Sequence, residues 1–125
     1  MWRKAGAPDP PSYIAFGWDE CLRALDKVAE ALREPDMGRD PSAAVGPGWV
    51  AEEALATALY CFLVVGGDAR GSIMRGAHSS GDSDAIAALA GAFAGAKHGS
   101  HYWLHEWTEV LEYQDRIRAL SQLWD

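Results

Sequence analysis

The sequence predicts an all-α fold, and three observations lead to this prediction. Apolar residues recur at steps of three and four positions over several long segments, which is the spacing of one helix face. No segment shows the alternation of apolar and polar residues that is typical of a half-buried strand. Segments rich in Gly, Pro, Asp and Ser separate the periodic stretches. We therefore expect a compact bundle of about four to five helices.

The first helix is predicted over residues 18–33, after an irregular lead-in over residues 1–17 that contains three of the six prolines. Pro35 ends the helix, because proline disfavours helical geometry in the residue before it. The predicted apolar face consists of Trp18, Cys21, Leu22, Leu25, Val28, Ala29 and Leu32.

The second helix is predicted from Trp49 to Val65, following a loop over residues 36–48. Glu52 and Glu53 fall in its first turn, where carboxylates suit the positive end of the helix dipole. The rest of this helix is apolar nearly all round, so we expect it to be buried on most sides. Residues 69–77 show only a weak helical pattern, and they lead into a loop over residues 78–84.

The third helix is predicted over residues 85–97, and one of its faces carries almost no side chains. Ala87, Gly91 and Gly95 are spaced four apart, so another helix or a ligand can approach this face closely. A last helix is predicted over residues 104–123. Its expected core positions are Leu104, Trp107, Val110, Leu111, Gln114, Ile117 and Leu120.

Composition indicates one soluble domain over residues 1–125, with 49% hydrophobic and 23% charged residues. The formal net charge of −7 and the lack of a basic run argue against nucleic-acid binding. No apolar stretch reaches the ~20 residues of a membrane span, and no signal peptide follows Met1. Two cysteines cannot form a disulfide framework, so we expect a reducing, cytoplasmic location.

The segment Gly81-Asp82-Ser83-Asp84 carries the most chemical information, because it ends where a helix begins. The helix dipole and nearby backbone N–H groups keep carboxylates ionised at such a place. Carboxylate oxygens are hard ligands of the type that Mg²⁺, Mn²⁺ or Ca²⁺ prefers. Ser and Asp before an apolar run are also ordinary helix caps, so the spacing alone leaves both interpretations open.

The wider sequence resembles the C-terminal signature of the ADP-ribosylglycohydrolase family, which includes the dinitrogenase-reductase-activating glycohydrolases. That signature is a Gly-Asp-x-Asp-Thr/Ser loop that opens a small-residue helix ending in Gly-Ala-x-x-Gly, and residues 81–99 are similar to it. The segment 46–55, Gly-Pro-Gly-Trp-Val-Ala-Glu-Glu-Ala-Leu, is similar to the glycine loop and helix that precede it in the family. Residues 107–117 are similar to the family's closing helix. The resemblance is best over residues 46–125 and implies a single, partial domain with the all-α fold of that family.

The resemblance implies a hydrolase that removes ADP-ribose from a protein or small-molecule acceptor, using a binuclear Mg²⁺ or Mn²⁺ centre. Asp82 and Asp84 correspond to metal ligands, and the resemblance assigns no catalytic residue. The residues corresponding to a substrate-binding border are Gly46, Gly48, Trp49, His78, Ser80 and Gly81. For two of these the sequence leaves a structural alternative: Trp49 in the core, and His78 as a solvated or capping residue.

The chain departs from the family pattern in two ways. Ala85 stands where the family has a hydroxyl ligand, and the family's N-terminal Ser/Thr-Asp-Asp motif is not found in this sequence. Two aspartates cannot fill a shell of roughly six oxygens, so water, an N-terminal partner chain or a second copy would have to complete it. The alternative function is a non-catalytic helical interaction module, or a degenerate remnant of the family.

A zinc site built from His98, His101 and His105 is a weaker hypothesis. Gly99-Ser100 interrupts any continuous helix there, so the three imidazoles do not share one face by periodicity. The sequence therefore favours the segment Gly81-Asp82-Ser83-Asp84, which we call the aspartate loop, as the site of chemistry.

Overall fold

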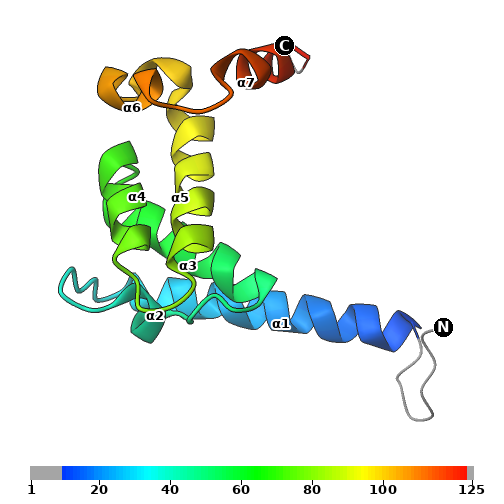
Figure 1. The fold of residues 1–125 in the computed structure, drawn as a ribbon. Coiled ribbons are helices and arrows are strands. Elements are labelled where there is room, and N and C mark those ends of the chain that lie inside the picture. Colours follow the sequence, from blue (N-terminus) through cyan, green and yellow to red (C-terminus); the bar gives the residue numbers. More distant parts are fainter. Residues whose placement is uncertain (1–9, 124–125) are drawn as a thin grey trace.

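The computed structural model describes residues 10–123, in which helices are joined by short loops and no strand occurs. This confirms the predicted all-α class (Figure 1). Seven α-helices and one 3₁₀ turn replace the expected four to five helices over this range. In chain order they are α1 (Pro10–Ala31), α2 (Pro41–Ala44), α3 (Ala51–Val64), α4 (Ala69–Ala77), α5 (Ser83–His98), η1 (Ser100–Tyr102), α6 (His105–Glu109) and α7 (Gln114–Ser121).

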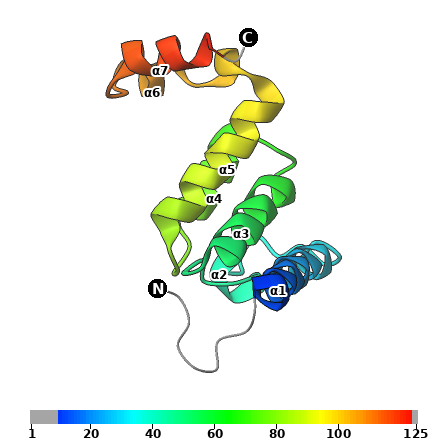
Figure 2. The ribbon, with the colours of Figure 1, turned by 90° about the vertical axis from the view of Figure 1, so that its right-hand side faces the viewer.

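The core lies where α3, α4 and α5 pack together, with the C-terminal half of α1 against α3 (Figure 2). Its members are mostly small, and Tyr60 and Ile86 are the largest fully buried apolar side chains of the described residues. Small side chains let helix backbones approach closely. The buried cluster consists of Ala24, Val28, Val45, Ala56, Ala58, Tyr60, Cys61, Ile86 and Ala90.

The contact between α4 and α5 depends on glycine. A Cβ atom added to Gly76 would lie 2.8 Å from Cα of Ala87, closer than real Cβ atoms come to backbone. One added to Gly91 would meet Cδ1 of Ile73 at 3.4 Å. The prediction that the bare face of α5 allows close approach is therefore confirmed, and α4 is the element that approaches.

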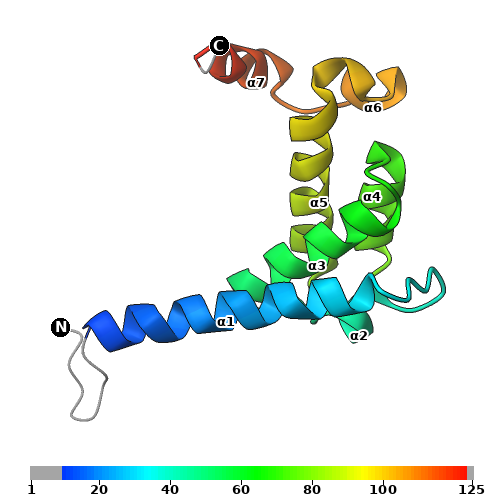
Figure 3. The same ribbon diagram turned by 180° about the vertical axis from the view of Figure 1, so that it is seen from behind.

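The N-terminal half of α1 extends beyond the rest of the molecule (Figures 1 and 3). The predicted irregular lead-in is wrong from residue 10 onward, because the helix begins at Pro10. Proline suits the first helical turn, where its missing N–H has no helical partner. The part of the lead-in over residues 1–9 lies outside the described residues.

Two helices form where the sequence showed weak or no periodicity. Asp68 caps α4 by accepting a hydrogen bond from the amide of Gly71 at 2.6 Å. Asp40 caps α2 in the same way, with an N–O distance of 3.0 Å to Ser42. Capping therefore starts two short helices that hydrophobic spacing could not reveal.

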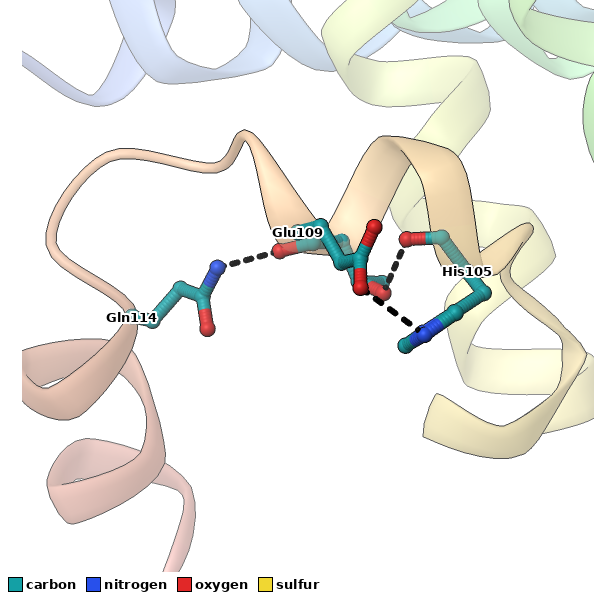
Figure 4. Close-up of polar contacts among 4 residues, drawn as sticks. His105, Glu109 and Gln114 are labelled. Carbon is teal, nitrogen blue, oxygen red and sulfur yellow. Dashed lines mark hydrogen bonds and ion pairs between the residues drawn. The ribbon is translucent and has the colours of Figure 1, made fainter.

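The C-terminal segment departs most from expectation, because the single helix predicted over 104–123 divides into α6 and α7. Tyr113 adopts a left-handed conformation with φ of 58° and separates the two helices. The side-chain amide of Gln114 donates to the carbonyl oxygen of Thr108, and His105 pairs with Glu109 at 3.0 Å (Figure 4). The expected core positions of this segment are not buried, so their prediction as core is wrong.

Among the helices of residues 10–123, none combines the length and the apolar character that crossing a membrane requires.

Candidate functional site

Asp82 and Asp84 stand side by side at the N-terminus of α5. Asp82 is the N-cap residue and its side chain makes no capping hydrogen bond, while Asp84 lies in the first turn. Asp84 is exposed and Asp82 is half-buried, so both carboxyl groups are within reach of solvent. The structure therefore places the two predicted ligand residues together at the start of α5.

Proximity changes the proton affinity of both groups. A hydrogen bond with the carboxyl group of Asp84, together with its negative charge, raises the pKa of Asp82 above the usual value. The same hydrogen bond, with bonds from the backbone amides of Asp84 and Ala85, lowers the pKa of Asp84. Two carboxylates so close repel each other when both are ionised, and a cation between them would relieve that repulsion.

The aspartate loop rests directly on the loop before α3. The amide of Asp82 donates to the carbonyl oxygen of Pro47 at 2.8 Å. A Cβ atom on Gly81 would lie 2.0 Å from the same oxygen, so only glycine allows this contact. Gly48 has φ of +81°, and a Cβ atom added to it would meet Ile86 of α5 at 3.0 Å. The two glycine loops that the sequence suggested for the site are thus adjacent in space.

A second anchor comes from the residues around α2. The carboxylate of Asp40 accepts hydrogen bonds from the amides of Ser42, at 3.0 Å, and Ser80, at 3.3 Å. The hydroxyl groups of Ser42 and Ser79 also bond to each other. Hydrogen bonds from Ser80 and Ser42 hold the pKa of Asp40 below its usual value. Asp40 therefore ties the loop that carries Asp82 to a segment about forty residues earlier in the chain.

Arg75 of α4 holds the loop that leads to Asp40. Its guanidinium group donates to three backbone carbonyl oxygens, those of Asp36 at 3.0 Å, Met37 at 2.6 Å and Arg39 at 2.7 Å. The rigid fork of an arginine can satisfy several acceptors at once. The loop is thereby fixed to the core before the chain enters α2.

The structure places the remaining predicted substrate-binding residues in different surroundings. Trp49 is 69% exposed, so its interpretation as a core residue is wrong. Ser80 is exposed, and its amide bonds to Asp40. Nδ1 of His78 lies 2.7 Å from the carbonyl oxygen of Met74, which is a contact within the C-terminal turn of α4. Gly46 is buried, and its carbonyl oxygen accepts from the hydroxyl of Thr57 at 2.8 Å.

The histidine-based zinc hypothesis finds no support in the described residues. Nε2 of His98 lies 2.7 Å from the carbonyl oxygen of Gly67, and its ring stacks on Tyr102. His105 instead pairs with Glu109. Within residues 10–123, no three or more His, Cys, Asp or Glu side chains gather as a metal-binding group. Asp82 and Asp84 are therefore a two-carboxylate arrangement within this range.

Asp40 and Arg75 help to hold the segments around the candidate site, and neither was predicted to do so from the sequence. Asp40-Pro41-Ser42 carries a recognisable start signal, an N-cap Asp followed by proline at the first helical position. Arg75 gives no comparable signal, because its acceptors are backbone carbonyl oxygens more than thirty residues away. Only the folded arrangement shows that Asp40 binds the amide of Ser80 and that Arg75 holds the segment leading to Asp40.

The family model for ADP-ribosylglycohydrolase matches residues 3–125. No curated protein and no solved structure matches the chain. The match spans the helices, the glycine loops and the aspartate loop described above, and the all-helical architecture agrees with it. The chain therefore belongs to the ADP-ribosylglycohydrolase family.

Proposed function

We propose that the chain forms the metal-binding part of a hydrolase that releases ADP-ribose from a protein or small-molecule acceptor. The family acts on ADP-ribosylated substrates and is generally metal-dependent. The observation that carries the proposal is the paired carboxyl groups of Asp82 and Asp84 at the start of α5. They lie within the part of the chain that the family model covers.

The residues present fit a Mg²⁺ or Mn²⁺ ion in part. Asp82 and Asp84 offer hard oxygen donors, and their mutual repulsion favours a bound cation. Ala85, the next residue, has no side-chain oxygen to add. A divalent ion held there would orient the ribose hydroxyls and prepare a water for attack at the anomeric carbon. The rest of the roughly six-oxygen shell has to come from substrate, water or another chain, and the family's second ion needs ligands from the same sources.

The backbone contacts supply the rigidity that such a site needs. The bond from the amide of Asp82 to Pro47 fixes the position of the N-cap residue. Asp40 fixes the loop two residues earlier, through Ser80. The carboxyl groups of Asp82 and Asp84 therefore lie where an anchored loop enters α5, and such anchoring is what a preorganised ligand pair requires.

The substrate is proposed to lie beside this loop. Trp49 follows Gly48 directly and offers an exposed indole ring on which a base can stack. Gly46, Gly48 and Gly81 would shape the border, while the side chain of Ser80 at the same loop is hydrogen-bonded to Asp40. His78 borders the loop in sequence and remains a weaker candidate because its Nδ1 is engaged by Met74. None of these residues is assigned a catalytic step.

A calorimetric titration of the purified chain with Mn²⁺ tests the proposed metal site. We expect saturable binding in the parent chain and at least about tenfold weaker binding in the Asp82→Asn/Asp84→Asn variant. The matched control is Asp26→Asn/Asp115→Asn, which removes two exposed carboxylates elsewhere and should bind as the parent does. Absence of saturable binding in the parent, or equal binding in both variants, would contradict the proposal.

The substrate side needs its own measurement. ADP-ribose with Mn²⁺ should raise the thermal midpoint of the parent chain, and Trp49→Ala should reduce that shift. Assaying release of ADP-ribose from a modified acceptor then distinguishes a hydrolase from the second candidate, a non-catalytic helical module. Ala85 and the lack of a third protein ligand among the described residues favour that second candidate. Metal binding without hydrolysis by the chain alone would support it.

A further inference from the structure

The hydroxyl group of Thr57 is fully buried in the apolar part of α3. Burying a hydroxyl group without a partner is costly, and a helical threonine commonly bonds to the carbonyl oxygen of the preceding turn. Oγ1 of Thr57 donates instead to the carbonyl oxygen of Gly46 at 2.8 Å, which lies eleven residues earlier and outside the helix. The hydroxyl group therefore binds the loop before α3.

Glu53 lies one turn before Thr57 on the same side of α3 and binds the same loop. Its carboxylate accepts a hydrogen bond from the amide of Gly48, with an N–O distance of 3.3 Å. Its side chain also lies against Gly46, where an added Cβ atom would meet Cγ and Cδ of Glu53 at 3.2 Å. Glu53 and Thr57 therefore hold the loop on either side of Pro47.

Pro47 is the residue of this loop to which the aspartate loop binds. Its carbonyl oxygen accepts a hydrogen bond from the amide of Asp82 at 2.8 Å. That carbonyl group and the amide of Gly48 belong to one planar peptide group, in which the N–H and C=O bonds point in opposite directions. Glu53 therefore holds one side of the peptide group whose other side binds Asp82. Thr57 holds the peptide group before it, through Gly46.

The same hydrogen bonds also act on the substrate side of the candidate site. Trp49 follows Gly48 directly, and its exposed indole ring is the proposed stacking surface for a base. Fixing the amide of Gly48 fixes the point at which the chain enters Trp49. One short segment, held by α3, thus links the proposed ligand pair to the proposed stacking residue.

We propose that Thr57 and Glu53 are positioning residues for the aspartate loop. They act through the backbone of residues 46–48 and set the orientation of the peptide group to which Asp82 binds. Their effect on a metal ion rests on the proposed function, because it requires that Asp82 and Asp84 are ligands. Their hold on the loop is independent of any ion.

Two substitutions of Thr57 test the proposal through calorimetric titration with Mn²⁺ and NMR amide exchange at Asp82, relative to Ala90 in the core of α5. Thr57→Val nearly keeps the shape of the side chain but removes the donor to Gly46. We expect relative exchange at Asp82 to rise at least about fivefold, as loss of a buried hydrogen bond allows. Mn²⁺ binding should weaken about tenfold, the lower end of the effect of partners that orient metal ligands. Thr57→Ser keeps the hydroxyl group and should restore both values.

Ser72→Ala is the matched control for a general loss of stability. Ser72 of α4 is also fully buried, and its hydroxyl group donates to the carbonyl oxygen of Asp68. The variant loses a bond of the same kind at the N-terminal end of α4, whereas the aspartate loop follows the C-terminal end of that helix. It should lower the midpoint of thermal unfolding but leave the relative exchange at Asp82 and the Mn²⁺ affinity as in the parent.

A pair of variants at Glu53 separates its hydrogen bond from its charge. Glu53→Gln and Glu53→Ala both remove the negative charge, but only glutamine keeps an oxygen that can accept from Gly48. We expect Mn²⁺ binding to be at least about threefold weaker in Glu53→Ala than in Glu53→Gln. Equal affinities in the two variants would overturn the role of Glu53.

The outcomes distinguish this proposal from the proposed function. Parental Mn²⁺ affinity and parental relative exchange in Thr57→Val would overturn the proposal for Thr57, and so would equal effects of Thr57→Val and Ser72→Ala. A parent chain that binds no Mn²⁺ would contradict the proposed function instead. The exchange rate at Asp82 would then decide by itself whether Thr57 positions the loop.

Discussion

The amide nitrogen of Asp82 lies 2.8 Å from the carbonyl oxygen of Pro47, and this bond joins the two loops that form the candidate site. The two residues are far apart in sequence and meet because Gly81, next to Asp82, has no side chain. The neighbouring Gly48 allows α5 to pack closely through Ile86. The position of the proposed ligand pair therefore depends on backbone contacts as well as on the carboxylates themselves.

Replacing Gly81 with alanine should disrupt the contact between the aspartate loop and Pro47. The new Cβ atom would lie 2.0 Å from the oxygen of Pro47 and 2.6 Å from the hydroxyl oxygen of Ser42, so backbone has to move. We expect a loss of about 2 kcal/mol or more in the free energy of unfolding, measured by urea denaturation. Gly17→Ala is the control: a Cβ atom there would meet nothing within 4 Å, so this substitution should be neutral or stabilising. Equal effects of the two substitutions would contradict the close contact.

Arg75 should be difficult to replace. Removing its guanidinium group in Arg75→Met leaves the carbonyl oxygens of Asp36, Met37 and Arg39 without this donor. We expect the free energy of unfolding to fall by about 1–3 kcal/mol. Arg75→Lys should recover only part of it, since an ammonium group lacks the planar fork. Hydrogen exchange at residues 36–40 should accelerate in both variants, and unchanged exchange would argue against this role.

Asp40 should make stability depend on pH. Its folded-state pKa lies below the usual 3.8 because Ser80 and Ser42 donate hydrogen bonds to the carboxylate. A lowered carboxyl pKa stabilises the fold above about 3.8, and that contribution is lost as pH falls through the folded-state value. Asp40→Asn should therefore unfold at a lower temperature than the parent at pH 7, and the difference should shrink toward pH 3. A constant difference over this range would indicate an effect unrelated to charge.

The two cysteines should react at very different rates with a thiol reagent. Burial raises the pKa of Cys61 to about 12, and its side chain is fully buried in α3. Its thiolate is therefore scarce at neutral pH and inaccessible to reagent. Cys21 is half-buried and lines an open groove beside α1, so it should be labelled first. Labelling of Cys61 should require denaturant, and equal labelling of the two in the native chain would contradict this burial.

Much of the helical architecture was predictable from spacing alone. The helix over Ala51–Val64 and its burial follow from a nearly continuous apolar segment. The bare face of α5 follows from Ala87, Gly91 and Gly95 at helical intervals. These features are local, because they depend only on which residues share a face of one helix.

Other features could not be predicted from the sequence, because they depend on contacts between segments that are far apart in the chain. The apolar positions on α7, such as Ile117 and Leu120, have helical spacing, yet they are 47% and 59% exposed. The left-handed conformation of Tyr113 broke a helix whose periodicity continued past it. The bond between Asp40 and Ser80 joins residues forty positions apart, and no local pattern encodes such a pairing. Asp82 and Asp84 were recognisable from sequence, whereas the structure that holds them was not.

The hydrogen bonds from Arg75 to the loop over residues 36–39 determine which residues of this segment can be substituted. All three of its acceptors are main-chain oxygen atoms, which every amino acid provides. Met37, which is 54% exposed, is therefore free to change, while the arginine that binds its carbonyl oxygen is not. A reporter group attached at residue 37 would occupy a defined position, because the hydrogen bonds that hold the loop are made by other side chains and by main-chain oxygen atoms.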